Sequence, residues 1–469
     1  MNFFQNYIFL LIMLLIQFNK LNTQGITSII SGNSNNGINT YYITLYFGEH
    51  KNAKTFLIDT TSSLISYKCN LDSSTNLYET IKEKDIINCQ NNSITCNNYP
   101  YSSCADNKCQ FEYNYNNSIS KGIYINQPIS FSGKGESHIF PIGCIQSETD
   151  DFLSKGSDGI LGLNMNNNSF LDILYKDKII PKKQFSICLN KKEGGFLYFG
   201  EISEDYHYNK NKNIKNIIVN YTPYNILENE MYLLEINSLY IEQGKNLISE
   251  EEKQNGIIDT LSVKTYLKES LYINLINEFL NYCLKEKDNC HNIQKMDNLG
   301  YCSNFKSKQE IIKSINKYWP KLIIGFNGYN HILSPENYFI AYASDGQIKA
   351  CISFEKTDKN YNILGTNILN GYNVIFDNEN TRIGFIESDC ETEEKKEVNN
   401  FENEQYINRV FDDPVNVIIV CASIGGIIIL VILLIILYRL FYKKSPKRKG
   451  YTRQVDVINS INSYLENQK

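Results

Sequence analysis

The chain has 469 residues, of which 42% are hydrophobic and 21% charged, and a formal net charge of −5. These proportions are typical of globular proteins and exclude a wholly disordered or collagen-like chain. A mildly acidic chain also lacks the basic face of a nucleic-acid-binding protein, so we expect no nucleic-acid partner. The length allows two or more folding units, because a domain typically holds about 100–200 residues.

The N-terminus carries an apolar run at residues 7–16, YIFLLIMLLI. Ten residues are too few to span a bilayer as a helix, but they match the apolar core of a secretory signal peptide. We therefore predict that residues 1–24 are a signal peptide.

From about residue 40 to residue 390, short runs rich in β-branched and aromatic residues alternate with Gly and Asn turns, which predicts a mostly β body. In chain order, strands are expected at residues 41–47, 55–58, 122–125, 195–199, 217–219, 321–324 and 372–376. Apolar spacing near 3.6 predicts helices at residues 169–176 and 267–284.

Thirteen cysteines are unusual for a cytosolic enzyme; twelve precede residue 400, and Cys421 lies in an apolar run. The chain has no C-x-x-C pair, which argues against a zinc ribbon. An even set of twelve favours disulfides formed in an oxidising compartment over a structural metal. The spacing leaves their connectivity open.

The C-terminal part predicts a membrane anchor. An acidic stretch, residues 393–414, resembles a stalk, and the mainly apolar residues 415–438 are long enough for one transmembrane helix. Basic residues follow it, so the positive-inside rule makes residues 439–469 a cytoplasmic tail. We expect a single-pass type I protein of the secretory or endolysosomal system or cell surface. N-x-S/T sequons at Asn91, Asn116, Asn167 and Asn220 predict a glycoprotein.

An internal repeat predicts two lobes. The sequence F-L-I-D-T ends at Thr60, and G-I-I-D-T ends at Thr260. Each is followed by Ile-Leu-Gly, 101 residues after Asp59 and 104 residues after Asp259. The pattern indicates an N-terminal lobe at residues 38–195 and a C-terminal lobe at 196–392, each offering one Asp from an apolar strand end.

Two such aspartates suit the attack of activated water on a carbonyl group. Two carboxyls held close together cannot both ionise freely, so they share a proton. The ionised member takes a proton from water, while the neutral member donates to the carbonyl under attack. The chain has no G-x-S-x-G or H-E-x-x-H pattern, and its five histidines form no cluster. We expect no cofactor and no metal.

The motifs resemble those of the pepsin-like aspartic protease family. They are most similar to its cysteine-rich branch, the nepenthesins and the membrane-anchored plasmepsin V type. Residues 59–69, DTTSSLISYKC, resemble that branch's first active-site motif, and residues 69–109 resemble its cysteine-rich insertion. The remaining motifs follow in family order: FPIGC at 140–144, SDGILGL at 157–163, FSICL at 185–189, GGFLYFG at 194–200, Trp319-Pro320, NILGTNILNGYNVIFD at 362–377 and RIGF at 382–385. The resemblance implies a bilobal, mostly β pepsin-like fold that acts as a monomer on polypeptide substrates.

The resemblance also implies roles for individual residues. Asp59 and Asp259 would be the catalytic dyad, and Tyr115 would be the flap tyrosine. Two pairs of hydroxyls would support the dyad. Ser62 and Ser262 would donate to the outer carboxylate oxygens, and Thr60 and Thr260 would interlock the two loops.

Two departures leave alternatives open. The family motif is Asp-Thr-Gly in both lobes, whereas here Thr61 and Leu261 replace the glycines. Glycine is usual where backbone approaches a ligand closely, so these side chains could crowd the dyad. The alternative to a peptidase is therefore a pepsin-fold pseudo-protease that binds peptides or partners. A third alternative, a cysteine-rich receptor of unrelated fold, does not account for the doubled Asp-Thr and Ile-Leu-Gly pattern.

Overall fold

The structure, a computed structural model, describes residues 25–32, 41–48, 50–69, 81–89, 96–115, 118–149, 157–166, 168–190, 193–202, 219–227, 230–249, 253–285, 290, 293–296, 300–344 and 347–390. The predicted signal peptide, stalk, transmembrane segment and cytoplasmic tail lie outside these residues. Within the described ranges, no helix combines the length and apolar character needed to cross a bilayer.

The N-terminal lobe is built on one large mixed sheet. Its described strands, in the order in which they pair, are β2 (Tyr42–Phe47), β3 (Asn52–Asp59), β9 (Gly159–Gly162), β4 (Ile65–Lys68), β8 (His138–Glu148), β7 (Ser118–Ser130), β6 (Lys108–Tyr115) and β5 (Ser102–Ala105). Strand β3 runs parallel to β9, with Asp59 opposite Gly162. The first Asp-Thr motif therefore lies beside the first Ile-Leu-Gly triplet.

The C-terminal lobe repeats this arrangement. Its described strands pair in the order β20 (Tyr329–Leu333), β19 (Leu322–Phe326), β14 (Tyr232–Ile241), β15 (Gln254–Ile258), β24 (Asn362–Leu364), β16 (Thr265–Lys268) and β23 (Phe354–Thr357). Strand β15 runs parallel to β24, with Ile258 opposite Leu364. The repeat in the sequence thus corresponds to the same pair of parallel strands in each lobe.

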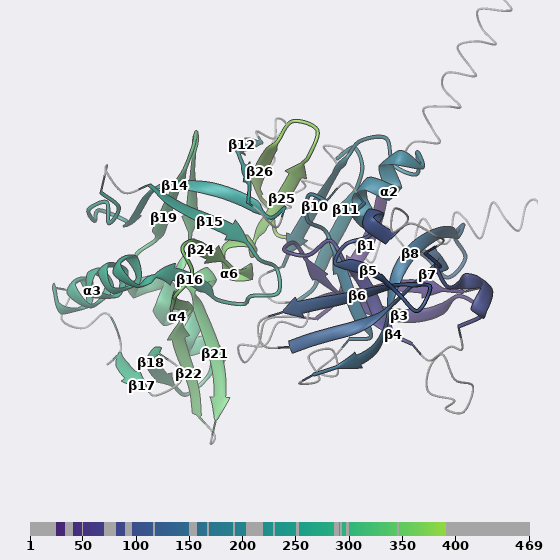
Figure 1. The fold of residues 1–469 in the computed structure, drawn as a ribbon. Coiled ribbons are helices and arrows are strands. Elements are labelled where there is room, and N and C mark those ends of the chain that lie inside the picture. The colour runs from purple at the N-terminus through teal and green to yellow at the C-terminus, as the bar shows by residue number, and fades with distance from the viewer. Residues whose placement is uncertain are drawn as a thin grey trace, which may run out of the picture. The chain divides into compact units, whose positions relative to one another are not determined.

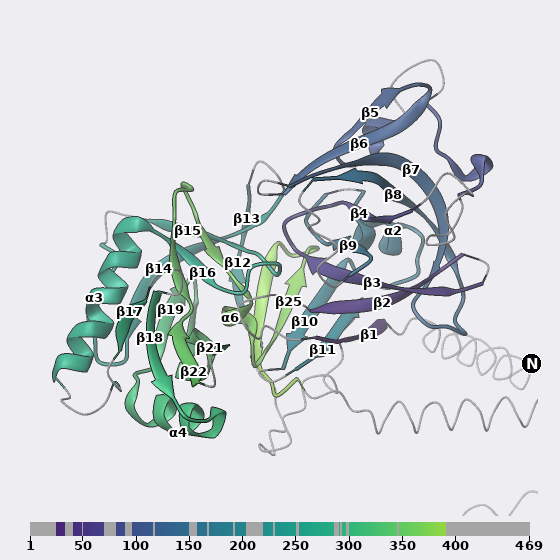
Figure 2. The same ribbon diagram turned by 90° about the horizontal axis from the view of Figure 1, so that it is seen from below.

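A third sheet takes strands from both halves of the chain (Figures 1 and 2). Its order is β1 (Ile26–Ile30), β11 (Gly195–Phe199), β10 (Gln184–Leu189), β25 (Tyr372–Asp377), β26 (Arg382–Glu387) and β12 (Asn220–Pro223). Every residue of β10 and β25 is buried, and Phe185 stacks on Phe376 with ring centroids 4.4 Å apart. Because these two central strands come from different lobes, the sheet joins the lobes through a shared apolar core.

The predicted mostly β character is confirmed, and so are the two predicted helices, which are α2 (Phe170–Lys176) and α3 (Glu269–Lys285). The strand expected at residues 217–219 begins instead at Asn220, and residues 217–218 lie outside the described ranges. Helix α4 (Lys308–Tyr318) was not predicted, although the Ser307 hydroxyl accepts a hydrogen bond from the Glu310 N–H in a recognisable capping pattern. A smaller sheet, also not predicted, pairs β17 (Gln294–Met296), β18 (Gly300–Phe305), β22 (Gln347–Ile352) and β21 (Phe339–Ser344).

The prediction that the twelve cysteines before residue 400 form disulfides is confirmed. The pairs are Cys69–Cys144, Cys89–Cys104, Cys96–Cys109, Cys188–Cys390, Cys283–Cys290 and Cys302–Cys351. Sulfurs of Cys89, Cys96 and Cys104 lie within 4.8 Å of one another, but they belong to two disulfides. A disulfide sulfur is not the thiolate that a structural zinc requires, so this cluster favours crosslinking over a metal.

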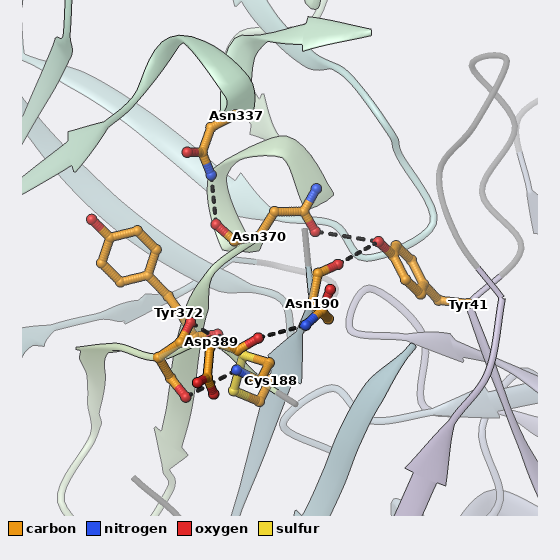
Figure 3. The surroundings of a disulfide bond; sticks show 9 residues. Tyr41, Cys188, Asn190, Asn337, Asn370, Tyr372 and Asp389 are labelled. Atoms are coloured by element: carbon orange, nitrogen blue, oxygen red, sulfur yellow. Dashed lines mark hydrogen bonds between the residues drawn. A yellow bond between two sulfur atoms is a disulfide. The ribbon is translucent and has the colours of Figure 1, made fainter. Parts of the chain in front are cut away.

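One disulfide joins the middle of the chain to its last described residue. Cys188 on β10 pairs with Cys390, 202 residues later. Beside it the Asn190 side chain donates to the Asp389 carbonyl oxygen over 2.6 Å, and the Tyr41 hydroxyl lies 3.4 Å from the Asn370 side-chain oxygen (Figure 3). The crosslink fastens the last described segment to the central sheet and restricts the unfolded chain through a very long loop.

Candidate active site

Each Asp-Thr motif stands at the end of a buried strand. Asp59 is the last residue of β3, and Asp259 follows β15 directly. The Asp59 carbonyl accepts a hydrogen bond from the Leu163 N–H over 2.7 Å, and the Asp259 N–H donates to the Leu364 carbonyl over 3.0 Å. The backbone of each aspartate is therefore bonded to the segment that carries the Ile-Leu-Gly triplet.

The glycine of each triplet makes room for the turn after the aspartate. A Cβ on Gly162 would lie 2.6 Å from the Ser62 carbonyl oxygen, and a Cβ on Gly365 would lie 2.2 Å from that of Lys264. Any side chain there would push the turn away from its strand. This close approach gives a physical reason for the triplet in both lobes.

The two turns are joined by reciprocal hydrogen bonds between Thr60 and Thr260. The Thr60 N–H donates to the Thr260 hydroxyl over 3.1 Å, and the Thr260 N–H donates to the Thr60 hydroxyl over 3.2 Å. The two hydroxyls in turn donate to the carbonyl oxygens of Ile258 and Ile58, over 2.8 and 2.6 Å. All four bonds cross between the lobes, so they hold the two aspartates in one site.

Asp259 has the hydroxyl support that the family resemblance implies. Its Oδ1 accepts the Leu261 and Ser262 N–H groups, over 2.9 and 3.3 Å. Its Oδ2 accepts the Ser262 hydroxyl over 2.6 Å. The backbone of Leu261 thus donates as a glycine would, and its side chain is partly buried.

Asp59 is supported differently, which corrects the expectation for Ser62. Its Oδ1 accepts both the N–H and the hydroxyl of Thr61, over 2.8 and 2.7 Å. The Ser62 hydroxyl instead accepts the Leu64 N–H over 3.0 Å, in a local turn. The Thr61 hydroxyl therefore bonds the same oxygen of Asp59 as the Thr61 N–H does. It does not replace a bond from Ser62 to the other oxygen, the position that the Ser262 hydroxyl fills at Asp259.

A tyrosine that the sequence analysis did not select completes this set. The Tyr113 hydroxyl lies 3.4 Å from Asp59 Oδ2, and the side chain is only 7% exposed. Tyr115 follows two residues later on the same strand, beside the hairpin turn, and its side chain lies outside the described part of the structure, so its flap role stays a prediction.

Burial and the paired charge change the titration of both carboxyls. Burial, followed by the nearby charge of Asp259, raises the pKa of Asp59 from 3.8 to about 7, against the hydrogen bonds from Thr61 and Tyr113 that lower it. Burial likewise raises the pKa of Asp259, while the Ser262 hydroxyl and the N–H groups of Leu261 and Ser262 oppose the shift. The pair therefore retains a proton up to about neutral pH, and one neutral acid beside one ionised base is what water activation needs.

The sequence matches two family models. The one described as xylanase inhibitor N-terminal covers residues 41–201, and the one described as xylanase inhibitor C-terminal covers residues 231–387. Both models together span the two lobes.

Three relatives cover most of the chain. Plasmepsin V of Plasmodium falciparum (isolate 3D7) is 25% identical over 433 residues, covering 75% of this chain and 71% of that protein. Aspartic proteinase-like protein 1 of Arabidopsis thaliana is 22% identical, covering 79% and 70%. An aspartic proteinase of Oryza sativa subsp. japonica is 24% identical, covering 76% and 88%. The duplicated lobes, the paired aspartates and these matches show that the chain belongs to the pepsin-like aspartic protease family.

Proposed function

We propose that the protein is a membrane-anchored aspartic endopeptidase, with Asp59 and Asp259 as its catalytic dyad. The observation that carries this proposal is the pair of buried carboxyls, one from each lobe, held together by the reciprocal bonds of Thr60 and Thr260. The loops keep this arrangement despite the replaced glycines, because the N–H groups of Thr61 and Leu261 still donate to the carboxylates.

The dyad would hydrolyse a peptide bond in two steps. The ionised carboxylate takes a proton from a water molecule held between the carboxyls, and the water oxygen bonds to the substrate carbonyl carbon. The neutral carboxyl gives its proton to the carbonyl oxygen, which leaves a neutral tetrahedral diol. The diol then collapses: a carboxyl protonates the leaving nitrogen, the C–N bond breaks, and the other carboxyl recovers a proton from the diol. No covalent enzyme intermediate and no cofactor are required.

The test is digestion of a peptide library by the purified full-length chain across pH 3–7. We expect cleavage that a statine inhibitor blocks, because a statine hydroxyl imitates the diol between the carboxyls. The pseudo-protease alternative is favoured by Thr61 and Leu261, which replace the family glycines two residues after each aspartate. That alternative predicts saturable binding of the inhibitor with no cleavage at any pH.

The two replaced glycines are expected to behave differently from each other. Thr61→Gly removes the hydroxyl that donates to Asp59 Oδ1, so activity should fall about tenfold, the effect of losing one hydrogen bond to a charged group. Leu261→Gly removes only a partly buried side chain and keeps the N–H donor, so activity should be unchanged or rise. Peptide cleavage rates and statine affinity measure both effects.

Thr61→Ser is the matched control, because it keeps the hydroxyl and should retain most of the activity. If Thr61→Gly is as active as the unaltered chain, the hydroxyl does not support the dyad. In that case the side chains of Thr61 and Leu261 affect activity only through the space that they occupy.

The membrane topology forms a separate prediction. With residues 415–438 as a single transmembrane helix, protease added to sealed microsomes should remove only a tail of about thirty residues and leave the body intact. Immunoblotting with one tag inserted after the predicted signal peptide and a second tag at the C-terminus would measure this. Complete digestion of the body in sealed vesicles, or release of the chain by alkaline carbonate, would contradict a type I anchor.

A further inference from the structure

Tyr101 lies in the cysteine-rich insertion in an unusual backbone conformation. Its φ is +55°, a left-handed value that a bulky side chain rarely adopts. Such a conformation is strained and persists only where the surroundings hold it in place. Tyr101 is therefore a position at which the fold maintains backbone strain.

The surroundings hold this segment from several sides. The Ser102 hydroxyl donates to the Tyr99 carbonyl oxygen over 2.8 Å, and the Tyr124 hydroxyl donates to that of Pro100 over 2.6 Å. The Glu112 N–H donates to the Tyr101 carbonyl itself over 3.3 Å. Two disulfides, Cys89–Cys104 and Cys96–Cys109, close the insertion on both sides of the segment.

The side chain of Tyr101 extends from the insertion toward the dyad. Its ring packs against the ring of Tyr113, with centroids 4.9 Å apart and planes tilted by 49°. Burial and the nearby Asp59 raise the pKa of the Tyr101 phenol, and hydrogen bonding by the Ser63 and Ser62 hydroxyls acts in the opposite direction. Tyr101 thus lies between the turn after Asp59 and the tyrosine that bonds Asp59, yet 41% of it remains exposed.

We infer that Tyr101 is a positioning residue: its ring fixes the Tyr113 side chain so that the Tyr113 hydroxyl donates to Asp59. The effect of Tyr101 on catalysis rests on the proposed function. The contacts from Tyr101 through Tyr113 to Asp59 exist whether or not the protein cleaves peptides. It gives the cysteine-rich insertion a direct connection to the dyad.

The chain of contacts has a measurable electrostatic consequence. The Tyr113 hydroxyl lowers the pKa of Asp59, against the effects of burial and of Asp259 that raise it. Two carboxyls act on this cluster: Asp259 after β15, and Glu230, whose charge acts on Tyr101. The neighbouring phenols are Tyr99 and Tyr124, and Tyr124 interacts electrostatically with Tyr101. Loss of a well-placed Tyr113 hydroxyl should therefore move the titration of Asp59 to higher pH.

The test compares Tyr101→Gly, Tyr113→Phe and the double variant in the full chain. Glycine adopts the left-handed conformation freely, so Tyr101→Gly removes the ring while it relieves the strain. We expect an unchanged or higher melting temperature, a fall in kcat of about tenfold with a smaller change in KM, and an alkaline limb of the pH profile shifted upward. Tyr113→Phe should shift the limb in the same direction, and the double variant should add little to either single change.

Three further variants make the result specific. Lys178→Gly is the matched control for strain relief, since Lys178 has a φ of +58°, is exposed and lies in a turn after α2. It should leave kcat and the pH profile unchanged. Tyr101→Phe keeps the ring and should retain most of the activity of the unaltered chain. Tyr101→Asn repeats the test if the glycine variant folds poorly, because asparagine also tolerates the left-handed conformation.

The inference is overturned if Tyr101→Gly and Tyr101→Asn leave the pH profile unchanged, or if they act additively with Tyr113→Phe. If the unaltered chain neither cleaves peptides nor binds a statine, the proposed function fails by itself. The titration of Asp59 is then followed through the pH dependence of unfolding, relative to Asp59→Asn. An upward shift in Tyr101→Gly still supports the positioning role, and an unchanged titration rejects it.

Discussion

Asp59→Asn and Asp259→Asn are each expected to reduce peptide hydrolysis by at least about 10³-fold, the upper range of what general acid–base catalysis contributes. An amide in place of either carboxyl can neither share the proton nor accept one from water. Each carboxyl acts only with its partner, so the double variant should be no slower than either single variant. Initial rates on a cleaved library peptide, in the full-length chain, measure this directly.

The control is a buried carboxyl outside the dyad. Asp172 in α2 lies 2.6 Å from the Lys176 ammonium and 2.7 Å from that of Lys183. Asp172→Asn should lower stability, because it removes the carboxylate that pairs with both ammonium groups, but should retain activity. Full activity in either dyad variant, with the fold intact by circular dichroism, would reject the proposed mechanism.

The rate of peptide hydrolysis should depend on pH as strongly as it depends on the two carboxyls, because the dyad works only while it holds one proton. As the pH rises through about 7, the pKa of Asp59, that proton is lost and the rate should fall about tenfold per pH unit. The pKa of Asp259 is raised as well, so the acidic limb should lie above the ordinary value of 3.8. A rate profile from pH 3 to pH 9 gives both limbs, and undiminished turnover at pH 9 would contradict the shared proton.

Stability should follow the same titration with a defined sign. A carboxyl whose pKa is raised by folding binds more protons in the native state between pH 3.8 and about 7, so the free energy of unfolding falls as pH rises across that window. Asp59→Asn lacks the ionisation, so the variant should gain up to about 4 kcal/mol relative to the unaltered chain between pH 4 and pH 8.

Buried His331 contributes with the opposite sign. Burial lowers its pKa from 6.5 to about 4, so its contribution to stability is lost as the pH falls through that range. His331 is present in both the variant and the unaltered chain and cancels in the comparison, which leaves the titration of the Asp59–Asp259 pair. Urea unfolding at matched pH values gives the difference, and a constant difference from pH 4 to pH 8 would show that Asp59 does not titrate in this window.

Much of the architecture followed from patterns that are local or repeated. Alternating β-rich runs predicted strands such as β2, β11 and β25, because burial of one or both faces of a sheet constrains the residues along it. The doubled Asp-Thr and Ile-Leu-Gly motifs predicted two similar lobes, and the structure places each triplet beside its aspartate. Strand β1 was not predicted, because a segment of five residues takes its conformation mainly from the strand with which it pairs. Helix α4 was missed although its Ser307 capping pattern is present in the sequence.

The sequence by itself therefore determined the β-rich lobes, the two aspartates at strand ends and the oxidised state of twelve cysteines. Only the tertiary structure decided which cysteines pair, with separations from 7 to 202 residues. It also decided that Thr61 rather than Ser62 donates to Asp59, and that Tyr113 and Tyr101 lie in one chain of contacts toward the dyad. The physical reason is the range of the interactions: strand periodicity is set by each residue's own burial, whereas the choice among neighbouring hydroxyls depends on ångström-scale distances between segments that only folding brings together.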